Sequence, residues 1–371
     1  MQPVLLSTVM GWMRSSGFSD GAALASGNYG ADGGCVAAPS GDAFADFELT
    51  GFASVEKAGP ADVCFWAGTT QKSETNAFGI SEAALSQIRA GLIFVPDNLG
   101  MDAAAFKKML PQVKCIVPVK NPYHVMVEFL KEFVESRDAA NLHRAAAIAE
   151  SRIAAIADCG IAASAKVHPS AVVEGTVGEN VVVGPNCVIM AGATVGANCK
   201  LEANVTIYPN VIVGEGCVFQ AGVVIGSRGF GFYEYEGERR MVPHLAGVRI
   251  GNGCSFGANT VVAAGFVSPT TIGNNCHFDS FVQIAHNCVL GDNIYMASQS
   301  GIAGTVTVED DVEFAGGAQS AGHLTIGKGA RIAAKAGVTK SVSAGKTVAG
   351  FPAVDIEKWR RSVVRLRMMD K

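Results

Sequence analysis

The chain has 371 residues, of which 49% are hydrophobic and 17% charged, a balance that excludes an intrinsically disordered protein. The formal net charge of −4 gives no general reason to expect nucleic-acid binding. No stretch reaches the roughly 18–20 uninterrupted apolar residues that a membrane-spanning helix needs. The opening run MQPVLLSTVMGWMR has no leading Lys or Arg, so no signal peptide is expected. These features predict a soluble, cytoplasmic protein with at most peripheral membrane contact.

The first third of the chain predicts a small α/β domain. Gly91–Pro96 and Cys115–Val119 are short apolar runs typical of buried strands. Asn121 followed by Pro122 predicts a helix start, because asparagine caps helices and proline suits the first helical position. The alanine-rich segment 138–157 predicts a second helix that leads into the next domain.

Apolar residues recur at every sixth position in the second half of the chain. The period runs from Val177 to Ile225, resumes at Ile250, and after a slip of four residues continues from Ile272 to Val338. An α-helix cannot use this period, because six residues rotate a side chain to the opposite face. A triangular solenoid can, with each hexad forming one side and Gly or Asn turning the corner. The 24 hexads, one of them polar at Ser320, give eight coils of 18 residues.

Hexad solenoids of this kind are left-handed, an exception to the right-handed crossover rule, and their coils stack at about 4.8 Å. We therefore predict a mainly β fold: a left-handed parallel β-helix of hexapeptide repeats, with an N-terminal α/β domain and a C-terminal helix. The expected boundaries are 1–120 for the α/β domain, 121–163 for a helical linker, 164–345 for the β-helix and 346–371 for a basic helical tail.

Six of the ten cysteines occupy one slot of the repeat, two positions before the inward aliphatic residue. They are Cys187, Cys199, Cys217, Cys254, Cys276 and Cys288. No C-x-x-C pair and no Cys/His group at zinc spacing occurs, so packing rather than metal or redox chemistry is the expected role.

Two interruptions break the period. Residues 226–247 are too polar and aromatic to line the prism, so they must loop out, and such loops commonly carry function. The shorter slip near Phe266–Pro269 is assigned no role beyond a corner.

One histidine stands out in the segment FVQIAHNCVLGDN. His286 lies two residues after Ile284, so its imidazole should face outward near a corner, and Asp279 is seven residues earlier. A carboxylate within reach could hold the imidazole tautomer. His323 follows 37 residues after His286, two coils plus one residue, and should lie on nearly the same edge.

The stretches LEANVTIYPNVIVGEGCVFQAGVVIG, GFGF, DSFVQIAHNCVLGDN and SGIAGTV resemble the UDP-3-O-acylglucosamine N-acyltransferases of lipid A biosynthesis. The resemblance runs from about Val167 to the C-terminus and more weakly over FELTGFASVEKAGPADVCF and VKNPY. It implies transfer of a 3-hydroxyacyl chain from acyl carrier protein to the 2-amino group of a UDP-linked 3-O-acylglucosamine, with no cofactor and no metal.

The resemblance also implies roles for individual residues. His286 matches the catalytic base, Asp279 the acidic residue that orients it, and Gly304 the backbone N–H that stabilises the thioester oxyanion. Residues matching substrate contacts are His323, Gln283, Gly229, Phe230, Gly231, His244 and Phe65. Phe65 fits the aromatic residue with which the family reads uracil, but Gly68 and Gln71 stand where the family has asparagine and tyrosine.

The C-terminal tail is a basic patch in an acidic protein. Acyl carrier proteins are strongly acidic, so the tail is expected to steer the donor, with a solvated helix or a contact between subunits as the alternatives. The arginines expected to meet the carrier are Arg360, Arg361, Arg365 and Arg367. We also expect a homotrimer, because one flat prism face cannot enclose a long acyl chain whereas two faces form a groove.

Two other classes of function stay open. One is a different hexapeptide-repeat enzyme, such as an O-acyltransferase of the same pathway or an amino-sugar acetyltransferase that uses acetyl-CoA. The other is a non-catalytic solenoid that serves assembly or resembles carbonic anhydrase. The carbonic anhydrase alternative requires three histidines converging on zinc, and no third histidine has spacing that matches His286 and His323.

Overall fold

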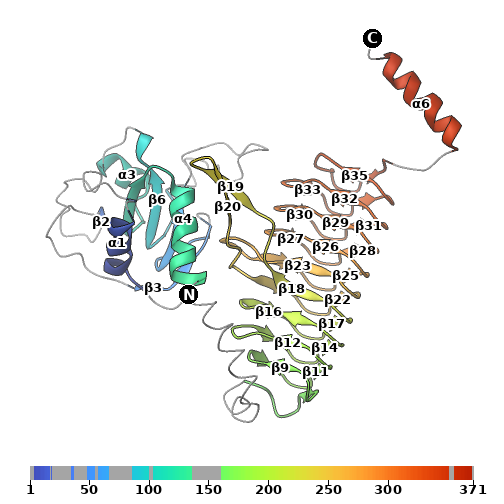
Figure 1. The fold of residues 1–371 in the computed structure, drawn as a ribbon, viewed down its shortest axis with the longest axis horizontal. Coiled ribbons are helices and arrows are strands. Elements are labelled where there is room, and N and C mark those ends of the chain that lie inside the picture. Colours follow the sequence, from blue (N-terminus) through green and yellow to red (C-terminus); the bar gives the residue numbers. More distant parts are fainter. Residues whose placement is uncertain are drawn as a thin grey trace.

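The computed structural model describes residues 4–16, 18, 35–36, 48–54, 57–66, 86–99, 103–135, 160–350 and 355–369. It comprises an N-terminal α/β domain, a long parallel β-solenoid and a C-terminal helix (Figure 1). The predicted fold class, mainly β with a parallel β-helix of hexad repeats, is confirmed.

A five-stranded parallel sheet lies at the centre of the N-terminal domain, in the order β2-β7-β6-β5-β4. Its strands are β2 (Cys35–Val36), β4 (Gly51–Phe52), β5 (Asp62–Phe65), β6 (Leu92–Pro96) and β7 (Cys115–Val119). The two apolar runs predicted as buried strands are β6 and β7. The other elements are β1 (Val4–Leu5), paired with β3 (Glu48–Leu49), and the helices α1 (Leu6–Ser15), η1 (Asp97–Leu99) and α3 (Ala103–Met109).

Helix α4 (Pro122–Leu130) begins where the sequence predicts. The side chain of Asn121 accepts a hydrogen bond from the backbone N–H of His124 at 3.0 Å, which satisfies one of the free donors at the helix start. The helix continues into a π-helical turn, η2 (Lys131–Glu135). Its apolar residues join the core of the N-terminal sheet, as the contact between Phe129 and Phe94 of β6 shows. The helix expected over 138–157 lies outside the described residues.

Three parallel sheets form the three sides of the solenoid, and successive strands along the chain alternate among them. The ten-stranded side contains β8 (Lys166–Val167), β11 (Val182–Val183), β14 (Lys200–Leu201), β17 (Val218–Phe219), β22 (Ser255–Phe256), β25 (His277–Phe278), β28 (Tyr295–Met296), β31 (Glu313–Phe314), β34 (Arg331–Ile332) and β36 (Thr347–Val348). The nine-stranded side contains β9 (Val172–Val173), β12 (Val188–Ile189), β15 (Thr206–Ile207), β18 (Val224–Ser227), β23 (Val261–Ala263), β26 (Gln283–Ile284), β29 (Gly301–Ile302), β32 (Gln319–Ser320) and β35 (Gly337–Val338).

The third side has eight strands. They are β10 (Thr176–Val177), β13 (Thr194–Val195), β16 (Val211–Val213), β21 (Val248–Ile250), β24 (Thr270–Ile272), β27 (Val289–Leu290), β30 (Thr307–Val308) and β33 (Thr325–Ile326). The stack is thus longer than the eight coils counted from the sequence. The added strands β8, β9 and β36 lie at its ends, where Val167, Val173 and Val348 are only partly buried and the apolar signal is weaker.

Asparagine turns many of the corners, as predicted. Nine asparagines have φ between 54° and 60°, the left-handed region that asparagine tolerates better than most residues. They are Asn180, Asn186, Asn198, Asn204, Asn210, Asn259, Asn275, Asn287 and Asn293. Two of them, Asn180 and Asn275, donate to the equivalent asparagine of the next coil, and these contacts help hold the coils in register.

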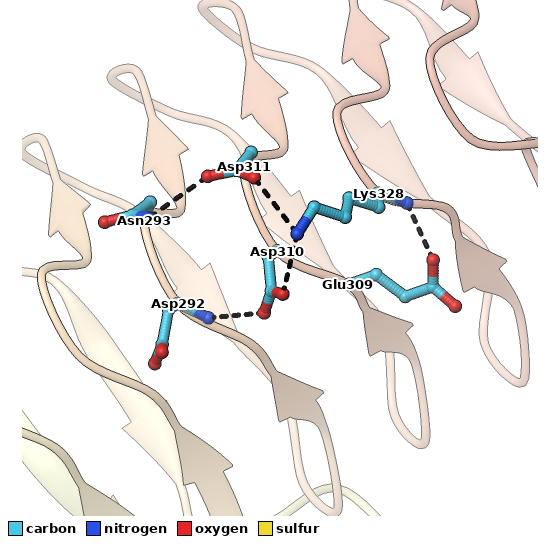
Figure 2. A network of polar contacts seen from close by, with 6 residues as sticks. All are labelled: Asp292, Asn293, Glu309, Asp310, Asp311 and Lys328. Atoms are coloured by element: carbon cyan, nitrogen blue, oxygen red, sulfur yellow. Dashed lines mark hydrogen bonds and ion pairs between the residues drawn. The ribbon is translucent and has the colours of Figure 1, made fainter.

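Figure 2 shows one such corner, where the chain leaves the eight-stranded side. Asn293 donates to Asp311 at 3.1 Å, and the backbone N–H of Asp292 donates to Asp310 at 3.0 Å, so each contact joins two neighbouring coils. On the next coil, the ammonium of Lys328 lies 3.2 Å from Asp310 and 3.5 Å from Asp311. These groups are exposed, so each ion pair contributes little stability and the ladder serves mainly to align the coils.

The six repeat cysteines are buried and unpaired, as the packing interpretation predicts. Each thiol donates to a backbone carbonyl of the next coil; for example, Cys199 Sγ lies 3.2 Å from the oxygen of Gly214. The slot is therefore small, apolar and satisfied by a weak S–H donor, which explains why it selects cysteine.

The long interruption forms an antiparallel hairpin, β19 (Phe232–Tyr235) and β20 (Glu238–Met241), which leaves the solenoid and meets α4 (Figure 1). Tyr233 Oη lies 2.7 Å from Nδ1 of His124, and the ring of Tyr235 stacks on the same imidazole at 3.7 Å. The core of the N-terminal domain extends to Val242 on the same excursion. The hairpin thus joins the two domains.

Candidate functional site

One corner of the solenoid carries the three residues His286, Gly304 and His323. The backbone N–H of Thr305 donates to the carbonyl of His286 at 2.9 Å, and that of His323 donates to the carbonyl of Gly304 at 3.1 Å. The corner joins the nine-stranded side to the eight-stranded side, after β26, β29 and β32. The predicted common edge for His286 and His323 is therefore present.

Two residues at this corner adopt unfavourable backbone conformations. Thr305 has φ of 63° and His323 has φ of 60°, in the left-handed region where most corners have asparagine or glycine. A β-branched residue such as threonine is rarely found there. Phe281, Gln299 and Lys335 have positive φ at the neighbouring corner, so only the β-branched Thr305 sets this corner apart.

Asn287 orients the imidazole of His286. Nδ1 of His286 lies 3.2 Å from Oδ1 of Asn287, and because an amide oxygen only accepts, Nδ1 carries the proton and Nε2 is the basic nitrogen. The amide itself is fixed at both ends: its oxygen also accepts from the N–H of Phe266 at 3.1 Å, and its Nδ2 donates to the carbonyl of Ser268 at 2.9 Å.

The short slip around Phe266 therefore does more than turn a corner, which corrects the expectation that it has no further role. It supplies both backbone partners of Asn287, and its Phe266 and Val267 side chains join the core of the N-terminal domain. Sequence reasoning missed Asn287 because it resembles the other corner asparagines. The signal that could have found it was the slip four residues long that precedes it.

The absence of a side chain at Gly304 leaves room for the imidazole of His286. A Cβ on Gly304 would lie 2.6 Å from both Cε1 and Nε2 of His286, a distance that real contacts do not reach. The N–H of Gly304 has no hydrogen-bond partner within the described ranges, as is also true of the equivalent corner positions of neighbouring coils. What distinguishes Gly304 is that the basic nitrogen of His286 lies against it.

The segment before the hairpin covers the same corner. A Cβ on Gly229 would lie 2.6 Å from Cβ of His286 and 2.8 Å from Cδ2 of His244, and one on Gly231 would lie 2.7 Å from Cε1 of His244. The rings of His244 and His286 are 4.6 Å apart between centroids. Phe230, between the two glycines, is 86% exposed and so is free to meet a ligand.

Burial dominates the electrostatics of the two histidines. It lowers the pKa of His286 below its usual value, and the nearby His323 lowers it further, while Asn287 and the Phe230 backbone favour the protonated ring. Burial also lowers the pKa of His244 to about 4, with smaller contributions from His286 and Arg228. Both rings are therefore neutral at pH 7, the state that a base requires.

Asp279 does not meet His286 within the chain. β26 lies between them, so a separation of seven residues places them at adjacent corners of one coil. The carboxylate of Asp279 accepts from the backbone N–H groups of Ser280 at 2.7 Å and Ser298 at 3.2 Å. It lines a groove of about 680 Å³ on the outside of the ten-stranded side, beside His277 and Tyr295.

The remaining predicted residues are more scattered. Gln283 is exposed on β26, two positions from the loop that carries His286. Phe65 is 4% exposed and packs against Tyr123 and Phe266 at centroid distances of 5.5 and 6.3 Å, so stacking on a base stays a prediction that requires this ring to be uncovered. Gly68 and Gln71 lie outside the described residues.

The basic tail forms helix α6 (Ile356–Met369), which lies apart from the solenoid in Figure 1. Arg360, Arg361 and Arg365 are exposed, and the side chain of Arg367 lies outside the described part of the chain. Among the described residues, no helix is long and apolar enough to cross a bilayer, and no group of three or more His, Cys, Asp or Glu could hold a metal ion.

Comparison with known proteins identifies the repeat. The family model "Bacterial transferase hexapeptide (six repeats)" matches residues 174–209, 192–227 and 269–304, and "Hexapeptide repeat of succinyl-transferase" matches 247–279. These repeats are the sequence signature of the left-handed β-helix predicted above. The acetyl- and acyltransferases that share them do not by themselves indicate a substrate.

Curated relatives are more specific. The chain is 43% identical over 146 residues to the UDP-3-O-acylglucosamine N-acyltransferase of Rickettsia akari, covering 39% of this chain and 42% of the relative. It is 37% identical over 192 residues to the protein of that name from Hydrogenovibrio crunogenus, covering 52% of this chain and 55% of the relative. The matches span about half the length of these relatives. The resemblance inferred from the sequence is thereby confirmed as a similarity.

A solved UDP-N-acetylglucosamine acyltransferase from Francisella novicida is 25% identical, with a TM-score of 0.44 over 54% of this chain and 73% of that chain. This overlap is too limited to bear on function.

Proposed function

We propose that the chain is an N-acyltransferase that transfers a 3-hydroxyacyl group from acyl carrier protein to the 2-amino group of a UDP-3-O-acylglucosamine. The proposal starts from its similarity to enzymes of that name and from the chemistry available at the His286 corner. No metal or cofactor is needed, because a thioester is already activated toward an amine.

Three groups take part in the reaction: the acceptor amine, the imidazole of His286 and the backbone N–H of Gly304. The amine nitrogen attacks the thioester carbonyl carbon, and Nε2 of His286 removes a proton from that nitrogen as the C–N bond forms. The Gly304 N–H donates to the carbonyl oxygen as it becomes an oxyanion, a contribution of roughly 3–4 kcal/mol where such a donor is in place. The C–S bond then breaks, and the imidazolium returns its proton to the departing sulfur.

The observation that carries this proposal is the contact between His286 and Gly304. It places a base of defined tautomer beside the Cα of Gly304, whose backbone N–H has no partner among the described residues. A base and an oxyanion donor at one point are what acyl transfer requires. The exposed ring of Phe230 and the residues His323 and Gln283 would then contact the acceptor or the acyl chain.

The basic tail supports a carrier protein as the donor. Exposed arginines on α6 would attract an acidic carrier, and such steering weakens with salt because charges are screened beyond about 8–10 Å. Reversing Arg360 and Arg361 to Glu should raise KM for the acyl carrier protein and leave a short acyl-pantetheine donor unaffected. Equal losses with both donors would favour a structural role of the tail.

The acyl groove is proposed to lie between copies of the chain in a homotrimer. Asp279 and His286 occupy opposite ends of the same coil side, so a ring of copies could present the Asp279 corner of one to the His286 corner of the next. In that arrangement Asp279 would support the imidazolium of a neighbouring copy rather than its own.

The deciding experiment supplies the protein with 3-hydroxyacyl carrier proteins of several lengths and with UDP-3-O-acylglucosamine, and follows the amide product by mass spectrometry. His286→Ala should lower turnover by about 10²–10⁴-fold without changing the melting temperature, because the side chain lies outside the aliphatic stack. Acylation only with acetyl-CoA would favour an acetyltransferase. No transfer with any donor would favour a non-catalytic solenoid.

A further inference from the structure

His244 lies beside His286 but comes from a different part of the fold. It follows the β19–β20 hairpin, is 6% exposed, and its ring is tilted 54° to that of His286 at 4.6 Å between centroids. A Cβ on Gly229 would meet the ring of His244 at 2.8 Å and the Cβ of His286 at 2.6 Å, so this glycine lets the loop lie against both residues. The pair is therefore held from two sides, His286 by the solenoid corner and His244 by the end of the loop.

The tautomer of His244 follows from its hydrogen bond. Nδ1 lies 3.0 Å from the carbonyl oxygen of Val242, and because that oxygen can only accept, Nδ1 carries the proton. In the neutral ring Nε2 is then a bare acceptor, and it has no hydrogen-bond partner in the parts of the chain that the structure describes. The groups facing the pair are His323, Asn287, the Phe230 backbone and Arg228.

The corner thus presents two neutral imidazole acceptors, Nε2 of His286 and Nε2 of His244. An amine that attacks through its lone pair carries two N–H bonds, whereas a hydroxyl carries one O–H bond. With two acceptors, the amine gives one proton to His286 and donates its second N–H to His244. A hydroxyl would leave the second acceptor facing an oxygen lone pair.

We propose that His244 is the specificity-determining residue of the site and selects an amine over a hydroxyl as the nucleophile. This inference rests on the proposed function and adds a cause for its amine selectivity. A site built to accept a hydrogen bond from its substrate discriminates strongly against an analogue that cannot donate, because a buried acceptor is left unpaired. The bond changes remain those of acyl transfer, since His244 accepts a hydrogen bond but takes no proton.

The test compares two acceptors that differ in one group: UDP-3-O-acylglucosamine and the matched UDP-3-O-acylglucose, which has a 2-hydroxyl. His244→Phe keeps an aromatic ring but removes the acceptor, and should lower kcat with the amine by about 10-fold or more while the slow rate with the hydroxyl changes less than about threefold. His244→Gln restores an acceptor through its amide oxygen and should recover most of the preference.

The outcomes distinguish a failure of the His244 selectivity role from a failure of the proposed acyl transfer. Equal losses with both acceptors in His244→Phe would overturn the selectivity role and leave His244 a packing residue. Wild-type protein that acylates both acceptors equally would also overturn it, while leaving acyl transfer intact. Wild-type protein that acylates neither would overturn the proposed function. Nitrogen-15 spectra at pH 7 give a check without activity, since a protonated Nε2 on His244 would exclude its use as an acceptor.

Discussion

At the scale of single residues, Asn287 determines which nitrogen of His286 is basic. Replacing it by Gly keeps the left-handed corner but removes the amide that holds Nδ1–H, so turnover should fall by about 10- to 100-fold, less than the loss of the base itself. The melting temperature should also fall, because the N–H of Phe266 and the carbonyl of Ser268 lose their partner, so kcat is compared at a temperature at which both proteins are folded. Turnover within threefold of wild type would mean that the imidazole is held by packing alone.

Asn287→Asp should change the pH dependence of activity at the same site. Activity requires neutral His286, whose pKa is already lowered by burial, so the wild-type rate should fall only as pH drops below about 6.5. A carboxylate beside Nδ1 favours the imidazolium, which raises the pKa of His286 and moves this acidic limb to higher pH. The measurement is kcat against pH, and a limb that does not move would contradict the assigned contact.

Gly304 offers a second residue test. In Gly304→Ala the new methyl group would meet Cε1 and Nε2 of His286 at 2.6 Å, so the ring must move, and activity should fall by about 10-fold or more while the fold persists. Gly337→Ala is the matched control, because a Cβ there would have no neighbour within 4 Å. Similar activities for the two variants would remove Gly304 from the site.

At the scale of elements, the β19–β20 hairpin meets α4 through Tyr233, whose hydroxyl lies beside His124 and whose ring packs on Tyr123. The ring of Tyr235 adds a stack on His124. Tyr233→Phe removes the hydroxyl that lies 2.7 Å from Nδ1 of the buried His124 and should destabilise the protein by about 1–3 kcal/mol, because Nδ1 loses this hydrogen-bond partner. Since the hairpin carries the Gly229–Gly231 segment, KM for the acceptor should rise.

Tyr235→Phe is the control for the hairpin. It keeps the stack on His124 at 3.7 Å and removes a hydroxyl that has no hydrogen-bond partner among the described residues. Both variants are compared by their unfolding in denaturant and by their KM for the acceptor. If the two variants behave alike, the Tyr233 hydroxyl does not fasten the hairpin.

The sequence predicted elements whose cause is local and periodic. Every sixth residue points inward, so the solenoid and the position of the hairpin follow from where the period holds and breaks. Contacts between residues far apart in the sequence could not be predicted from the six-residue period. The docking of Tyr233 depends on His124, 109 residues away, and Asn287 differs from other corner asparagines only through its bonds to the slip. Asp279 and His286 looked paired by spacing, yet one side of the coil, formed by β26, separates them.

At the scale of the whole molecule, the proposed trimer makes a prediction about mixtures. If Asp279 of one copy serves His286 of the next, His286→Ala and Asp279→Asn proteins should each be weakly active alone and regain part of the activity when refolded together. Light scattering should give the mass of three chains. An active monomer at micromolar concentration, or no recovery in the mixture, would place the complete site within a single chain.

The buried thiols give four successive coils a chemical probe that reports when each coil opens. Cys199, Cys217, Cys254 and Cys276 follow one another up a single corner, and all four are buried. The hydrogen bond with Cys217 lowers the pKa of Cys254, but the Cys276 thiol and burial outweigh it and raise that pKa to about 12. A buried thiol is out of reach of alkylating reagents until its coil separates from the next. Because a solenoid coil contacts only its neighbours, unravelling should proceed from an end rather than everywhere at once. The order in which these four cysteines become labelled would therefore record the direction in which the molecule unwinds.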